Sequence, residues 1–181
     1  MKRGILAVLL LMTALCGCSG TEERLGNTAE DIRAAYARPY RAECAASVKS
    51  NKGENAYTFT LDWQDADTYQ LQFDGMTVAV GGGRSTISGG NGVVDAGTAE
   101  GVLPLLPGAF LQQFFAQPQQ EVAEQDGLLV LEAPVEAPNP YRAAMRLYLN
   151  GGRLTPVKLT VLDSQGNERI QVDFLDFTFK K

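Results

Sequence analysis

The chain has 181 residues with 21 acidic and 16 basic side chains, which gives a formal net charge of -5 at pH 7. This acidic balance disfavours nucleic acid as a partner. Histidine is absent, so neither a Ser-His-Asp or Cys-His catalytic system nor an imidazole zinc site can form. We therefore expect a protein that is not an enzyme and has no cofactor or metal. A hydrolase that uses carboxylates alone remains a remote alternative, because the acidic residues are scattered without a suggestive pair.

The first residues have the pattern of an export signal. Lys2 and Arg3 precede a short apolar run that ends in Leu15-Cys16-Gly17-Cys18, which is similar to the bacterial lipobox. The run is too short to be a permanent membrane span. We predict a lipoprotein signal peptide over residues 1–17 and lipidation of Cys18 by acyl chains such as palmitate, which would anchor the protein in the membrane. An ordinary secretory signal with incidental cysteines is the alternative.

Residues 18–26 are predicted to be a lipidated tether, because they are small, polar and charged, and residues 27–181 one domain. The expected location is extracytoplasmic, on the cell membrane, or on the outer membrane of a Gram-negative organism. With Cys16 removed and Cys18 acylated, Cys44 has no partner for a disulfide bond. Its place in a strand pattern favours a small buried hydrophobe over a reactive thiol.

The first half of the domain is predicted to be a helix followed by an antiparallel meander. Thr28 with Asp31 resembles a capping box for a helix that ends before Pro39. Apolar residues then alternate with polar ones over 40–48, 57–63, 69–73 and 76–80, with an Asp-Gly turn at 74–75. The glycine-rich stretch 81–92 lacks the spacing of a phosphate loop and is predicted to be a flexible hairpin. Three aspartates at 62, 65 and 67 are too few for a calcium loop.

The second half contains one apolar helix between further strands. The helix is predicted over about 107–116, after Pro107, and is apolar enough to require cover by the concave face of a sheet. The proline-rich stretch 133–140 is predicted to be a surface loop. The apolar phase of the last strand changes near Phe174 and Leu175, which indicates a bulge. The fold class is therefore α+β, with one curved antiparallel sheet wrapped over helices.

Together these features resemble the LolA/LolB-type lipoprotein carrier superfamily. The resemblance rests on the lipobox, the short helix, the meander, the apolar helix, and the closing pattern from Pro156 to Leu159 and from Asp163 to Asn167 into the final strand. It implies an open half-barrel over 27–181, with an N-terminal and a central helix against its concave face. The superfamily includes carriers of acyl chains and germination lipoproteins similar to GerS, which bind protein partners. No arginine here is matched to the one that joins helix to sheet in carriers.

Two functions follow as hypotheses. The first is an envelope lipoprotein that binds an apolar ligand, a lipid or a lipoprotein acyl chain, in the concave face. The second is an interaction lipoprotein of the GerS type that acts through an envelope protein partner, with its hollow filled by its own side chains. The candidate cavity residues, which ordinary core packing would also explain, are Tyr57, Phe59, Leu61, Trp63, Leu71, Phe73, Leu106, Phe110, Phe114 and Phe115.

Overall fold

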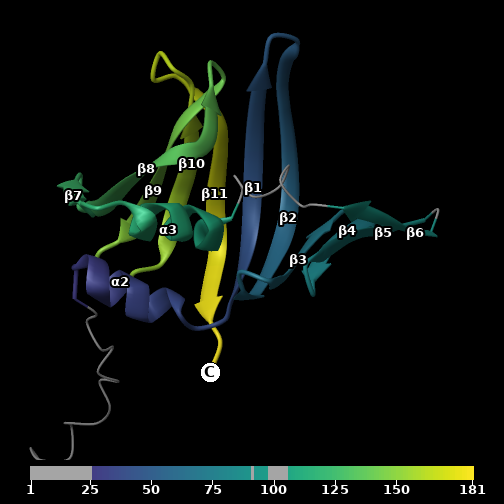
Figure 1. Cartoon of the computed structure of the whole chain (residues 1–181), viewed down its shortest axis with the longest axis horizontal. Coiled ribbons are helices and arrows are strands. Elements are labelled where there is room, and N and C mark those ends of the chain that lie inside the picture. Colours follow the sequence, from purple (N-terminus) through teal and green to yellow (C-terminus); the bar gives the residue numbers. More distant parts are fainter. Residues whose placement is uncertain (1–25, 91, 98–105) are drawn as a thin grey trace, which may run out of the picture.

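The computed structural model describes residues 26–90, 92–97 and 106–181, so the predicted signal peptide and nearly all of the tether lie outside the described residues. The described chain forms one antiparallel sheet with two helices (Figure 1). Its elements are α2 (Ala29–Tyr36), β1 (Tyr40–Ser50), β2 (Gly53–Asp65), β3 (Thr68–Phe73), β4 (Met76–Gly81), β5 (Arg84–Gly89), β6 (Gly92–Gly97), α3 (Pro107–Ala116), β7 (Val122–Gln125), β8 (Leu128–Asn139), β9 (Arg142–Asn150), β10 (Pro156–Leu162) and β11 (Glu168–Phe179).

The sheet places the first and last strands side by side at its centre. Its order is β6-β5-β4-β3-β2-β1-β11-β10-β9-β8-β7, and every neighbouring pair is antiparallel. Strands β6 and β7 are the two edges, and the sheet curves without closing between them (Figure 1). The expected fold class, an open half-barrel with a helix at its start and an apolar helix across it, is confirmed.

Helix α2 begins as the sequence predicts. The Thr28 side chain accepts a hydrogen bond from the Asp31 backbone N–H, and the Asp31 carboxylate accepts one from the Thr28 N–H. These two bonds satisfy backbone donors that the first turn of a helix leaves without partners. On the other face of the helix, Ile32 and Ala35 are buried against the sheet. The capping box thus fixes where the helix starts, and the apolar pair fixes which side it buries.

Alternation along the central strands separates core from solvent. In β1, Tyr40, Ala42, Cys44 and Ala46 are buried, and the residues between them are exposed or half-buried. The predicted bulge in the last strand is confirmed: Glu43 pairs with Asp176 and Cys44 with Phe174, which leaves Leu175 unpaired and exposed. The bulge accounts for the change of apolar phase, because one extra residue reverses which side chains face the core.

One local prediction was incomplete and one was wrong. Within the glycine-rich stretch, Arg84–Gly89 is strand β5, because Ser85, Thr86 and Ile87 pair with β4 while Gly82 and Gly83 adopt positive φ in a tight turn. The predicted surface loop 133–140 is mostly the second half of β8, which runs to Asn139. β7 pairs with β8 only as far as Leu131. The prolines lie farther along β8, beyond this pairing, so they remove no hydrogen bond between β8 and β7. Within the described ranges, no helix is long and apolar enough to cross a membrane.

Candidate binding face

Helix α3 is seated on an aromatic row of the concave face. Tyr40, Trp63 and Tyr69 lie opposite one another on β1, β2 and β3, and their rings stack with centroids 5.7 and 5.3 Å apart. The backbone N–H of Gly108 donates to the Tyr40 hydroxyl at 3.1 Å. A Cβ at residue 108 would lie 2.2 Å from the Trp63 ring, so only glycine permits this approach. The start of α3 is therefore fixed by Pro107 at its first turn and by contact of Gly108 with the row.

Most of the predicted cavity residues meet beneath α3, where they are packed. Leu61, Leu71, Leu106, Phe110 and Phe114 are fully or almost fully buried in one core cluster. Phe59 and Trp63 are also buried, and Phe73 and Phe115 pack against the cluster half-buried. Tyr57 does not join them: it lies farther along β2 and is 48% exposed. The sequence pattern therefore identified the residues of the concave face but not whether they leave an internal space.

A cation–π contact joins the two helices and was not predicted from the sequence. The guanidinium of Arg33 in α2 lies 4.2 Å from the centre of the Phe115 ring in α3. Such contacts contribute about 0.5–1 kcal/mol at exposed sites. Arg33 and Phe115 are far apart in the chain, so only the folded structure shows that they meet.

The part of the concave face that α3 leaves uncovered lies on strands β4 to β6, which we call the arm. Leu71, Val78, Ile87 and Val94 occupy one row across β3 to β6. Burial decreases along the row: Leu71 and Val78 are buried, Ile87 is half-buried and Val94 is 65% exposed. Val93, which alternates to the opposite face of β6, is 72% exposed. In Figure 1 the arm extends away from the strands that α3 crosses.

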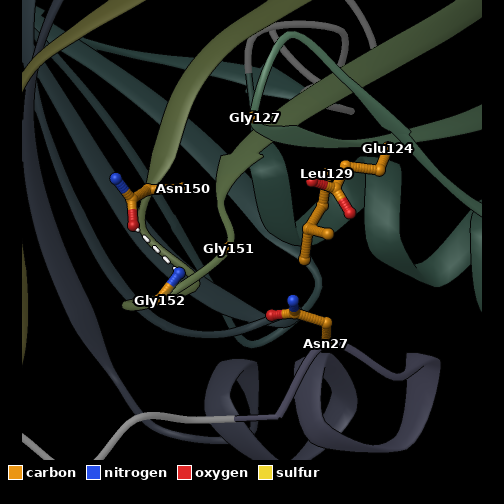
Figure 2. A pocket seen from close by; sticks show the side chains of 7 residues that line it. All are labelled: Asn27, Glu124, Gly127, Leu129, Asn150, Gly151 and Gly152. Atoms are coloured by element: carbon orange, nitrogen blue, oxygen red, sulfur yellow. Dashed lines mark hydrogen bonds between the residues drawn. The ribbon is translucent and has the colours of Figure 1, made fainter.

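Several surface cavities lie outside the α3 core, and two of them border either predicted cavity residues or the start of α2. An open groove of about 540 Å³ is lined by Phe59 and Phe73 together with polar residues and the exposed Leu175. A second cavity of about 370 Å³ lies between α2 and the turns that follow β7 and β9 (Figure 2). It is lined by Asn27, Asn150, three glycines, Glu124 and Leu129, and by none of the predicted cavity residues.

Cys44 is buried as expected. Burial raises the pKa of its thiol to about 12, and the nearby Glu43 carboxylate adds to this effect. A thiolate is the reactive form of cysteine, so the folded protein disfavours nucleophilic chemistry at this position. Asp62, one of the three aspartates considered for calcium, binds Lys180 at 2.6 Å instead. Among the described residues, no group of three or more Cys, Asp or Glu side chains is arranged to hold a metal ion.

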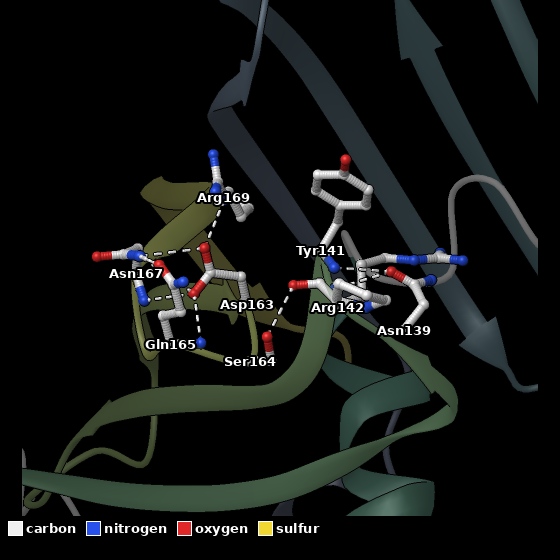
Figure 3. A network of polar contacts seen from close by, with 9 residues as sticks. Asn139, Tyr141, Arg142, Asp163, Ser164, Gln165, Asn167 and Arg169 are labelled. Atoms are coloured by element: carbon white, nitrogen blue, oxygen red, sulfur yellow. Dashed lines mark hydrogen bonds and ion pairs between the residues drawn. The ribbon is translucent and has the colours of Figure 1, made fainter.

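A polar network fixes the end of the sheet opposite α2 (Figure 3). The Asp163 carboxylate accepts hydrogen bonds from the backbone N–H groups of Gln165 and Asn167, both at 2.9 Å, and from Arg169 Nε at 2.8 Å. Burial alone would raise the pKa of Asp163, but the bonds from Asn167, Gln165 and Arg169 outweigh it and lower the pKa to about 2. The network thus holds the β10–β11 turn and positions Arg169.

Comparisons with solved structures show the fold. No known protein family and no curated protein matches the sequence. A chain in the complex of the CwlD amidase from Clostridioides difficile with the GerS lipoprotein superposes with a TM-score of 0.54 and 23% identity, over 83% of this chain and 93% of that one. An uncharacterized conserved protein from Thermus thermophilus gives 0.50 and 12%, over 83% of both chains.

The complex of MucA and MucB from Pseudomonas aeruginosa also contains a similar chain, with a TM-score of 0.50 and 18% identity. That match covers 84% of this chain and 57% of the other, so this chain spans little more than half of that structure. The half-barrel that the LolA/LolB-type resemblance implies is confirmed by the sheet order, and the likeness to the GerS complex supports it.

Proposed function

We propose that this protein is an extracytoplasmic lipoprotein, anchored through acylated Cys18, that binds a protein partner through its arm. One observation carries the proposal: the side chains of α3 are buried in the core cluster, while Val93 and Val94 on the outermost strand of the arm stay exposed. Phe110 and Phe114 occupy the space where a ligand would lie. Val93 and Val94 instead project from opposite faces of the outermost strand.

An edge strand is suited to binding another protein. The outer side of β6 has no neighbouring strand in the described sheet, so this edge can pair with an added strand. A valine on each face would then contact side chains of the partner on both sides of the extended sheet. The structurally similar proteins support this choice, because GerS occurs in a complex with CwlD and MucB in a complex with MucA.

The test is a double substitution, Val93→Lys with Val94→Lys. Both side chains are exposed, so we expect the free energy of unfolding to change by no more than about 0.5 kcal/mol per site. Binding to the envelope protein that co-purifies with the wild type should be lost in a pull-down from membranes. Leu175→Lys is a matched control, because Leu175 is equally exposed at the central bulge. Unchanged binding by the double variant would contradict the proposal.

Binding of an apolar ligand remains a second candidate, and one observation favours it. The inner row from Leu71 to Val94 continues the apolar face beyond the cover of α3. An acyl chain of a lipid or lipoprotein lying along this row would cover Ile87 and Val94. Bound lipid that is lost in Val94→Lys but kept in Leu175→Lys would favour this candidate over the protein partner.

A further inference from the structure

A small pocket with three basic residues in its lining lies at the end of the sheet opposite α2. We call it the rim pocket. It has a volume of about 380 Å³ and is formed where the β1–β2 turn approaches the β8–β9 turn and the start of β11. Figure 1 shows the β1–β2 turn at one end of the sheet and α2, the first described element, at the other. The lining residues are Lys49, Ser50, Asn51, Lys52, Tyr141 and Arg169.

The charge of the rim pocket differs from that of the whole chain. Three of its lining residues are cations and none is acidic, although the protein carries a net negative charge. β1 pairs with β11 as far as Val48 opposite Ile170, so Lys49 and Arg169 occupy the next positions on adjacent strands. Like charges in such positions repel each other and destabilise the pair. A bound anion would remove that repulsion.

The carboxylates near the pocket leave part of this charge unbalanced. Asp163 binds Arg169 through Nε. Glu54 lies opposite Lys49 on β2 and accepts a hydrogen bond from the Ser47 hydroxyl. No ion pair in the described structure involves Lys52, which is exposed at the turn. The pocket therefore has more positive groups than neighbouring carboxylates.

Two groups of the rim pocket, Arg169 and the Tyr141 backbone, are held in place before any ligand binds. Asp163 fixes Arg169, and the Ser164 backbone N–H donates to the Pro140 carbonyl at 3.1 Å, which joins the β10–β11 turn to the β8–β9 turn. The Asn139 side chain accepts from the backbone N–H of Tyr141 at 2.9 Å (Figure 3). Groups positioned in advance lose less conformational entropy on binding.

Tyr141 gives the pocket a flat apolar wall. Its side chain is 59% exposed at the tip of a turn, although burying the ring elsewhere would be favourable. A tyrosine ring combines a large apolar face with a hydroxyl that stays hydrated, and such rings are enriched where proteins bind other molecules. A site made of one aromatic face and several cations suits a ligand that is flat on one side and anionic at its edge.

We propose that the rim pocket binds an acidic sugar unit of an envelope glycan. The anionic oxygens lie between Lys49 and Arg169, and the sugar ring lies against Tyr141. Guanidinium groups bind carboxylate and phosphate oxygens with similar geometry, so the anion is a carboxylate or a phosphate on the sugar. Under the anchoring proposed above, the pocket lies at the end of the domain opposite the tether, which favours a glycan over a lipid headgroup.

The test is titration calorimetry of the full-length protein in a zwitterionic detergent. The probes are oligogalacturonate, which carries carboxylates, dextran phosphate, which carries phosphates, and polyglutamate, which is anionic without sugar. We expect one or both glycans to bind, and the tighter one identifies the anionic group. Lys49→Glu and Tyr141→Ala should each weaken binding by about tenfold or more. Lys181→Glu, the same charge change at the opposite end, should leave affinity unchanged.

Three results would overturn the proposal: no binding of either glycan, equal binding of polyglutamate, or equal loss of affinity in Lys181→Glu. Equal binding of polyglutamate would assign the pocket to an acidic protein. Lys49 and Tyr141 are both exposed, so these variants are expected to fold, and thermal unfolding checks this. The Val93→Lys, Val94→Lys variant should keep its affinity for the glycan, which separates failure of the rim pocket from failure of the arm.

Discussion

At the scale of single residues, Asp163 and Cys44 are both buried, but only Asp163 has hydrogen bonds that stabilise its charged form. Asp163 is nearly inaccessible yet ionised, because hydrogen bonds from Asn167, Gln165 and Arg169 replace water. Cys44 is buried without such partners, and its pKa rises instead of falling. The sequence predicted the burial of Cys44 from strand alternation. It could not predict the role of Asp163, because that role depends on a turn conformation that brings several donors to one carboxylate.

We predict that the contribution of Asp163 to stability is lost in acid. Its pKa is lowered to about 2 in the folded protein, against about 3.9 in an unfolded chain. A lowered pKa means that the contribution is complete above about pH 4 and declines as the pH falls toward 2. Asp163→Asn should therefore lower the free energy of unfolding at pH 7, and its difference from the wild type should shrink near pH 2. Urea unfolding at several pH values measures this.

The exposed Asp67 provides a control for the acid prediction. Asp67→Asn removes the same charge from an exposed side chain and should leave the free energy of unfolding at pH 7 within about 0.5 kcal/mol of the wild type. The acid prediction is contradicted if the difference in unfolding free energy between Asp163→Asn and the wild type stays constant from pH 7 to pH 2. The Asp163 carboxylate would then not stabilise the fold through its charge.

At the scale of elements, α3 decides whether the hollow is open or filled. The sequence predicted its bounds from Pro107 and the apolar run, and the structure confirms them. Elements were missed where the local signal was ambiguous: the glycines on either side of β5 obscured a short strand, and the prolines of β8 imitated a loop. Both strands depend on pairing with neighbours that the local sequence does not reveal.

We predict that Gly108→Val displaces α3. The new Cβ would lie 2.2 Å from the Trp63 ring, so either the ring or the helix must shift, which disturbs the hydrogen bond from Gly108 to Tyr40. Overpacking of this kind costs about 1–3 kcal/mol, which unfolding in urea would measure. Gly81→Ala is the control, because a Cβ there meets nothing within 4 Å. A neutral Gly108→Val would show that α3 is not seated on the aromatic row.

At the scale of the whole molecule, the fold was more predictable than the use of its surfaces. Alternating strands joined by turns predicted a meander, whereas the pairing of β1 with β11, the first and last strands, at the centre of the sheet was not predicted. Burial of Phe110 and Phe114 was expected in either hypothesis, so the pattern could not separate a cavity from a core. The rim pocket was not predicted, because its lining comes from three segments far apart in the chain.

Native mass spectrometry of the chain from Ser19 onward tests most directly whether the hollow is filled. We predict a mass without bound lipid after gentle purification, and no uptake of added fatty acid or phospholipid, because Leu106, Phe110 and Phe114 already occupy the concave face. A stoichiometric lipid adduct that disappears on Phe110→Asp, in a protein that still folds, would contradict the filled core and assign the concave face to an apolar ligand.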